Sequence, residues 1–176
     1  MRSACAVLLL FAACSKRGLP ELEAYPSILA TDPTIAADPR VKSCLAGTAS
    51  ACAEAASALG GGTITGKEEP EARTAAYAVG CRNGDPNLCG EVANALARGY
   101  GAAKDIATAM RIFQQACDAN DGVSCSLLAS IYKRGDEGVA PDKDKARALL
   151  EKGCALHDKT ACASLAPRHR HSIPEH

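Results

Sequence analysis

The sequence predicts an all-α protein, an αα-hairpin repeat solenoid stapled by disulfides. Three observations support this fold class. Eight of the ten cysteines form four pairs, and the members of each pair are eight residues apart. The second cysteines of the pairs recur at steps of 37, 36 and 37 residues, and a fixed period in the thirties is typical of solenoids built from helical hairpins. The residues between paired cysteines are turn formers, such as Asn120-Asp121-Gly122.

The cysteine spacing indicates that the chain reverses between the members of a bonded pair. On one straight helix, residues separated by eight would have Cα atoms about 12 Å apart, whereas a disulfide needs them within about 7 Å. Zinc sites usually have about two to four residues between ligands, so a spacing with seven intervening residues argues against a metal site, and we predict none. We predict four local disulfides, each across the turn of a hairpin: Cys44–Cys52, Cys81–Cys89, Cys117–Cys125 and Cys154–Cys162.

The N-terminal residues predict export. Residues 1–13 carry one positive charge, Arg2, before an apolar run too short to span a membrane, which is typical of a signal peptide. The segment ending in Ala13-Cys14 resembles a bacterial lipobox, so we predict lipidation of Cys14; an ordinary cleavage site near Ala13 is the alternative. Lipidation of Cys14 and loss of Cys5 would leave eight cysteines in four pairs, without an odd thiol. The expected location is the outer membrane or periplasm as a lipoprotein, or the exterior as a secreted protein.

Three further segments are predicted after the signal. Residues 14–40 are expected to form a lipidated N-terminus and a semi-extended, proline-rich tether. Residues 41–166 are expected to form the repeat domain, with a partial N-terminal cap and about three repeats. Residues 167–176 follow Pro167 as a flexible tail. The prolines that suggest the tether are Pro20, Pro26, Pro33 and Pro39.

Within the repeats, apolar residues recur at helical spacing. Two segments keep one apolar face each: Ile106, Ala109, Met110, Phe113 and Cys117, and then Ala146, Leu149, Leu150 and Cys154. Asp105 is placed to cap the first of these helices, and Pro70 and Pro141 are expected where helices begin. Glycine pairs end the preceding helices. The columns shared between repeats are Ala56, Ala93 and Ala129; Leu59, Leu96 and Tyr132; and Gly62, Gly99 and Gly135.

These columns carry a family resemblance. Tyr132-Lys133-Arg134-Gly135, then Gly138-Val139-Ala140-Pro141-Asp142, Lys145-Ala146 and Cys154 resemble the Sel1-like repeat, a relative of the tetratricopeptide (TPR) repeat. With the paired cysteines, residues 41 to 165 are similar to the cysteine-rich, secreted Sel1-like proteins first grouped in Helicobacter. The resemblance implies a right-handed α/α superhelix that serves mainly in protein interaction. It also implies an alternative, since some cysteine-rich members carry a penicillin-binding or β-lactamase label.

Composition limits the function classes. The formal net charge is zero and the pI is about 6.9, so nothing favours binding to nucleic acid or to an anionic membrane surface. Aromatic residues make up 3% of the chain, and the abundant alanines bury little apolar area each. A disulfide that closes nine residues contributes about 2.5 kcal/mol on the loop-entropy model. We expect a monomer without a cofactor whose partner is a protein or peptide and whose stability depends on its disulfides.

One set of residues is predicted to line a concave binding face. Counted from the second cysteine of each pair, positions five and nine share one face of the first helix of a repeat, away from the apolar columns. In αα-solenoids that helix usually lines the concave side, although a solvated face without a ligand explains any single one of these residues equally well. The candidates are Ser57, Asn94, Arg98, Ser130 and Arg134.

One of these residues, Ser130, also belongs to a sequence that resembles a hydrolase motif. Ser130-Ile131-Tyr132-Lys133 matches the S-x-x-K of serine β-lactamases, and Lys159-Thr160-Ala161 falls one residue short of their K-T-G. The S-D-N element is missing, and Tyr132 belongs to a core column of the repeat. We therefore predict no catalytic residues and a binding or scaffold module, with a β-lactam hydrolase as the alternative.

Overall fold

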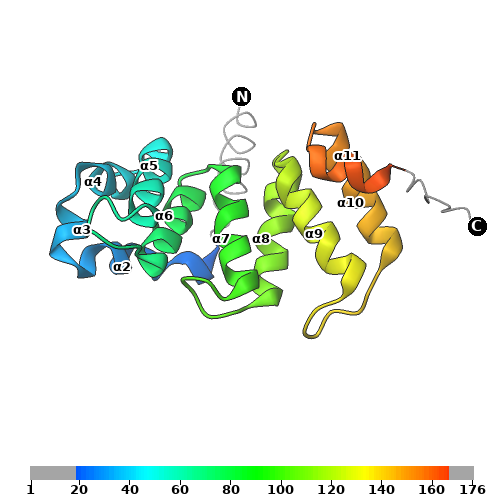
Figure 1. Cartoon of the computed structure of the whole chain (residues 1–176), viewed down its shortest axis with the longest axis horizontal. Helices are drawn as coiled ribbons and strands as arrows, with labels where there is room; N and C mark the ends of the chain where they lie inside the picture. Colours follow the sequence, from blue (N-terminus) through cyan, green and yellow to red (C-terminus); the bar gives the residue numbers. More distant parts are fainter. Residues whose placement is uncertain (1–18, 167–176) are drawn as a thin grey trace, which may run out of the picture. The chain divides into compact units, whose positions relative to one another are not determined.

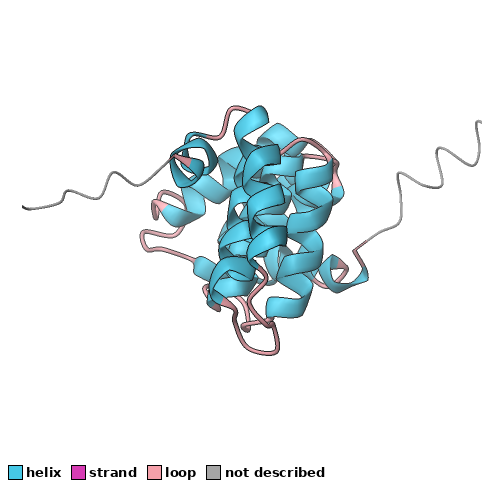
Figure 2. Ribbon diagram, turned by 90° about the vertical axis from the view of Figure 1, so that its right-hand side faces the viewer, coloured by secondary structure: helices cyan, strands magenta, loops and turns pink. Residues whose placement is uncertain are grey.

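A computed structural model describes residues 19–166, which form two compact units, one up to Gly84 and one from Asp85 onward. The predicted signal peptide, the lipidation site Cys14 and the tail 167–176 lie outside the described residues. Every regular element between residues 19 and 166 is helical, with one isolated bridge between Asp136 and Val139 (Figures 1 and 2). None of these helices combines the length and the hydropathy needed to cross a membrane.

The first unit consists of a 3-10 helix and five α-helices. They are η1 (Pro20–Leu22), α2 (Tyr25–Thr31), α3 (Pro33–Ala37), α4 (Pro39–Leu45), α5 (Ala49–Gly60) and α6 (Pro70–Arg82). Helix α5 packs against α4 and α6, and α2 also packs on α6. The fully buried side chains of the first unit include Leu22, Leu29, Val41 and Leu59.

The proline-rich tether predicted for residues 14–40 is wrong in its described part, because residues 20–40 fold into helices that belong to the first unit. The prolines stand at the first positions of these helices, where the missing N–H is not needed. The residue before Pro33 is Asp32, whose carboxylate accepts a hydrogen bond from the Thr34 N–H at 2.7 Å. Asp38 caps the helix of Pro39 in the same way. Aspartate followed by proline therefore starts a helix here instead of extending the chain.

The second unit is an alternating stack of five helices. They are α7 (Pro86–Arg98), α8 (Ile106–Asp118), α9 (Gly122–Arg134), α10 (Lys143–Ala155) and α11 (Lys159–Leu165). Each helix packs against the next one in the chain, and α9 also contacts α7 and α11. The first helices of successive repeats thus form one layer, whereas α8 and α10 lie in the other. Both predicted apolar faces lie toward the core. On α8 all the predicted residues are buried except Met110, which is half-buried. On α10 Ala146 and Leu150 are buried, and Leu149 and Cys154 are half-buried.

The ends of the helices in this unit follow local sequence rules. Every helix is preceded by an aspartate whose side chain accepts backbone N–H groups of the first turn: Asp85, Asp105, Asp121, Asp142 and Asp158. Gly99 has φ +69° at the end of α7, a left-handed conformation that other residues adopt only with strain. The prediction that a helix begins at Pro141 is off by two residues, because Asp142 is the cap and α10 begins at Lys143.

Disulfides close the hairpins at their turns. The Cα atoms lie 4.5 Å apart in Cys44–Cys52, 4.8 Å in Cys117–Cys125 and 4.6 Å in Cys154–Cys162. Cys81 and Cys89 are also disulfide-bonded. The members of the first two of these pairs are fully buried, whereas Cys154 and Cys162 are half-buried.

Small residues bring helices close together within the second unit. Gly153 of α10 lies against Gly122 of α9, and a Cβ on Gly153 would be 3.1 Å from the Gly122 carbonyl oxygen. The adjoining core consists of Ala129, Ala146, Leu150 and Ala161. Such a core buries little area per residue, which agrees with the alanine-rich composition.

Candidate functional site

Two polar positions recur on neighbouring helices of the second unit. Asn94 and Arg98 lie on α7, and Ser130 and Arg134 occupy the equivalent positions of α9, which contacts α7. Both arginines are exposed, and no described residue forms an ion pair with either of them. Asn94 and Ser130 are half-buried. The two helices can therefore present a repeated polar and cationic pattern to a ligand.

Ser57, the fifth predicted residue of this face, lies in the first unit. It is exposed on α5, two residues before the buried Leu59. The structure brings the candidates of α7 and α9 together in one layer of the second unit; Ser57 belongs to the other unit.

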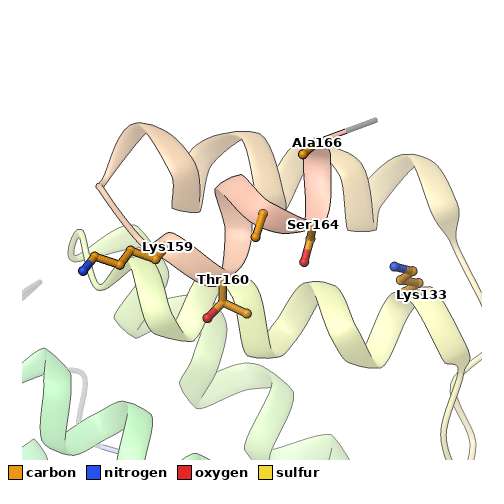
Figure 3. A pocket seen from close by; sticks show the side chains of 6 residues that line it. Lys133, Lys159, Thr160, Ser164 and Ala166 are labelled. Carbon is orange, nitrogen blue, oxygen red and sulfur yellow. The ribbon is translucent and has the colours of Figure 1, made fainter. Parts of the chain in front are cut away.

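A second surface, which the sequence did not indicate as a site, is a pocket of about 510 Å³ beside α11. It is lined by Lys133 of α9 and by Lys159, Thr160, Ala163, Ser164 and Ala166 at the end of the described chain. Figure 3 shows Lys133 and Lys159 at opposite ends of this site, with the Thr160 and Ser164 side chains between them. The cations thus flank a row of hydroxyl groups and do not converge on one point.

A second pocket of about 370 Å³ adjoins the first, because Lys133 and Ser164 line both. It adds Lys143, Ala146, Arg147, Leu150 and Leu165, so an apolar wall of Ala146, Leu150 and Leu165 lies among three cations, Lys133, Lys143 and Arg147. We call the two pockets together the basic groove. It lies between α9, α10 and α11.

Within the part of the chain that the structure describes, the charge of the basic groove is largely uncompensated. No carboxylate of residues 19–166 lines either pocket. Arg147 forms an ion pair with Glu151 at 3.0 Å. In contrast, no described carboxylate forms an ion pair with Lys133, Lys143 or Lys159.

The hydrolase motif is not assembled into a reactive site. Lys133 and Thr160 line the larger pocket, but Ser130 is not among its lining residues. Activation of a serine needs a base within hydrogen-bond reach in a shielded site. The described residues show no hydrogen bond between the Ser130 hydroxyl and Lys133, and the alternative of a β-lactam hydrolase has no support in this geometry.

Comparison with solved structures identifies the fold. The structure is similar to a protective antigen of uropathogenic Escherichia coli that displays an SLR fold, with a TM-score of 0.65 and 21% identity over 83% of this chain and 32% of that chain. It is similar to a Sel1 repeat protein from Oxalobacter formigenes, with a TM-score of 0.64 and 19% identity over 76% of this chain and 53% of that chain. The chain has the fold of a Sel1-like repeat protein.

The cysteine-rich branch of this fold is also represented. Cysteine-rich protein B of Helicobacter pylori matches with a TM-score of 0.54 and 23% identity, over 72% of this chain and 89% of that chain. The local disulfides of the present chain fit that likeness.

Sequence comparison gives a weaker relation. No family model matches the chain. A curated relative, cytochrome c oxidase assembly factor 7 of Xenopus tropicalis, is 35% identical over 60 residues, which are 34% of this chain and 26% of that protein. The chain therefore spans about a quarter of that relative and about a third of the Escherichia coli antigen.

Proposed function

We propose that this Sel1-like repeat chain is an exported protein- or peptide-binding module of the cell envelope. The observation that carries this proposal is the repeated pattern of Asn94 with Arg98 and Ser130 with Arg134 on two adjacent helices of one layer. Repeat proteins bind extended partners on surfaces where equivalent positions of successive repeats recur. Neither arginine has an ion-pair partner among the described residues, so both guanidinium groups can make charge-assisted hydrogen bonds to a bound partner.

The test is crosslinking in the native host followed by capture of the full-length protein. We expect the double variant Arg98→Glu/Arg134→Glu to lose a partner that the wild type captures. A matched control reverses two charges elsewhere, Lys42→Glu/Arg111→Glu, on helices α4 and α8. Equal capture by the wild type and both variants would refute a role for these arginines.

The disulfides support export, because disulfides persist in oxidising compartments. We propose further that a lipid on Cys14 holds the chain at a membrane as a monomer without a cofactor. A multiply acylated cysteine binds a bilayer firmly, at about 0.8 kcal/mol per buried methylene. The Cys14→Ser variant is expected to move from the membrane fraction to the soluble fraction and to lose the mass of the acyl groups. Unchanged membrane association of that variant would contradict lipidation.

The proposed module acts by binding and not by catalysis. We expect the purified oxidised protein not to hydrolyse the chromogenic cephalosporin nitrocefin. Turnover that disappears in a Ser130→Ala variant would instead establish the hydrolase.

A further inference from the structure

The basic groove combines three features that together describe a ligand. Its larger pocket has a lysine at each end, Lys133 and Lys159, and hydroxyl groups between them (Figure 3). Its smaller pocket combines the apolar side chains of Leu150 and Leu165 with three cations, Lys133, Lys143 and Arg147. A ligand that fits both must carry separated anionic groups and at least one apolar side chain.

The charge pattern of the larger pocket disfavours a small single anion as its occupant. One phosphate or sulfate is bound most tightly where several cations converge on it, whereas Lys133 and Lys159 lie at opposite ends of the larger pocket. An extended chain with a carboxylate near each lysine satisfies both cations at once. The hydroxyl groups of Thr160 and Ser164 can pair with backbone groups of such a chain between its charges.

The apolar side chains of the smaller pocket favour a peptide as the ligand of the basic groove over a polymer that carries only anionic groups. Leu150 belongs to the core cluster of the last hairpin, and Leu165 packs against that cluster while remaining partly exposed. An apolar side chain of a ligand would continue this packing and remove further area from water. The residues that follow Ala166 in the sequence begin Pro167-Arg168-His169-Arg170-His171 and carry the same sign of charge as the groove.

We infer that the basic groove between α9, α10 and α11 binds an acidic peptide segment of a partner protein, with carboxylates at Lys133 and Lys159 and an apolar side chain against Leu150 and Leu165. This inference rests on the proposed function as a protein-binding module and adds a second surface and the chemical class of the partner. The site is distinct from the arginines of α7 and α9.

The experiment uses the full-length oxidised protein and a fluorescent peptide of sequence Glu-Leu-Glu-Glu-Leu-Glu, with binding followed by anisotropy. The same peptide with glutamine in place of every glutamate is the neutral probe. We expect the acidic peptide to bind roughly tenfold or more tightly than the neutral one, and raising the salt from about 0.05 M to about 0.5 M to weaken it, because exposed charges are screened.

The protein variants distinguish this groove from the first surface. Lys133→Glu/Lys159→Glu is expected to lower the affinity roughly tenfold or more, whereas Arg98→Glu/Arg134→Glu, with the same change of net charge, is expected to leave it unchanged. A Leu165→Ser variant tests the apolar wall without changing charge and is expected to weaken both peptides. Thermal melts of each variant verify that the fold is retained.

Several results would overturn the inference. Equal loss in both charge-reversal variants would indicate attraction to net charge alone. Loss only in Arg98→Glu/Arg134→Glu would assign the peptide to the first surface and leave the proposed function intact. Equal affinity for the acidic and neutral peptides would show that Lys133 and Lys159 do not bind carboxylates of the ligand. A zero-length crosslink from Glu175 to Lys133 or Lys159 in the unliganded protein would identify the chain's own tail as the occupant.

Discussion

Replacing Gly90 with alanine is expected to destabilise the protein, although alanine is the better helix former. Gly90 lies in α7, and a Cβ at this position would be 2.7 Å from Ser124 Oγ and 2.8 Å from Asp121 Oδ2 of α9. Both distances are shorter than ordinary van der Waals contacts, so α7 and α9 would have to separate or these side chains would have to move. Asp121 cannot move freely because its carboxylate caps α9, accepting from the N–H groups of Val123 at 3.2 Å and Ser124 at 3.1 Å.

The magnitude follows from three opposing contributions. Alanine in place of glycine inside a helix stabilises by about 0.5–1 kcal/mol. Overpacking costs about 1–3 kcal/mol, and loss of an aspartate cap costs about 0.5–2 kcal/mol. The expected net loss in the free energy of unfolding is therefore about 0.5–4.5 kcal/mol.

Ser124 provides the internal control. Its hydroxyl is fully buried and has no hydrogen-bond partner among the described residues, so Ser124→Ala removes an unsatisfied polar group. Alone, it is expected to leave stability unchanged or to raise it by about 1 kcal/mol. In combination with Gly90→Ala it removes the shorter of the two clashes, and the double variant should be more stable than the sum of the single effects predicts.

The assay is urea unfolding of the four oxidised proteins, followed by far-ultraviolet circular dichroism. The coupling free energy is obtained from the double-mutant cycle. A Gly90→Ala variant at least as stable as the wild type would refute the close approach of α7 and α9. Strict additivity with Ser124→Ala would show that the serine is not the obstacle.

Two further predictions concern the disulfides and the aspartate caps. Removal of the disulfide Cys117–Cys125 by paired alanine substitutions should lower the melting temperature more than removal of Cys44–Cys52, although the two closed loops have the same length. The reason is that α9, which carries Cys125, packs against four helices, α7, α8, α10 and α11. Equal shifts of the melting temperature in the two variants would contradict this ranking. Hydrogen bonds from the first turn of α8 hold the pKa of Asp105 below its usual value. The ionised carboxylate therefore contributes fully to the free energy of unfolding above the unfolded pKa near 3.8, and this contribution is lost as the pH falls through the lower folded pKa. The Asp105→Asn variant keeps the helix cap but removes the charge, so its difference in melting temperature from the wild type should disappear in acid. A difference that does not change with pH would show that the charge of the carboxylate is not what stabilises the helix.

The cysteine spacing and the helical periodicity were sufficient to predict the hairpins. The disulfide of each hairpin follows from geometry, since residues eight apart can bond only across a turn, and the structure has Cys44–Cys52, Cys117–Cys125 and Cys154–Cys162. The glycine column was equally informative at Gly99, where the left-handed conformation ends α7.

The error at residues 19–40 came from composition. Four prolines suggested an extended tether, but the position of a proline relative to its neighbours matters more than its frequency. The pairs Asp32-Pro33 and Asp38-Pro39 combine a capping carboxylate with a residue suited to the first helical position. These pairs were visible in the sequence and would have predicted α3 and α4.

The basic groove could not be predicted from sequence patterns. Lys133 and Lys159 are 26 positions apart in the sequence, and each alone is typical of a solvated helix surface. Only the packing of α11 against α9 brings them to the two ends of one pocket. That no described carboxylate pairs with these lysines is likewise a property of the packed hairpin, because acidic residues nearby in sequence, such as Asp142 and Glu151, pair with other cations.

The two ends of the hairpins in the second unit are held by contacts of different strength, and this difference predicts where the unit opens. At the cysteine end a covalent bond joins α8 to α9. At the other end the loops 99–105 and 135–142 are connected by an exposed ion pair, Lys104 to Asp136 at 3.2 Å, which raises the pKa of Lys104 and contributes to lowering that of Asp136. Exposed ion pairs are screened by salt and contribute little to stability.

Local opening should therefore begin at the loops. Amide hydrogens of residues 99–105 and 135–142 are expected to exchange faster than those of the turn around Asn120, and more so at high salt. Hydrogen exchange with mass spectrometry at two salt concentrations measures both, with Lys104→Met as the control that removes the ion pair at low salt. Faster exchange at the cysteine turn than in the loops would mean that the disulfide does not determine where the hairpin opens. Slow exchange in the loops that is unaffected by salt or by Lys104→Met would mean instead that backbone contacts such as Asp142 N–H to the Tyr132 carbonyl, at 2.7 Å, hold that end.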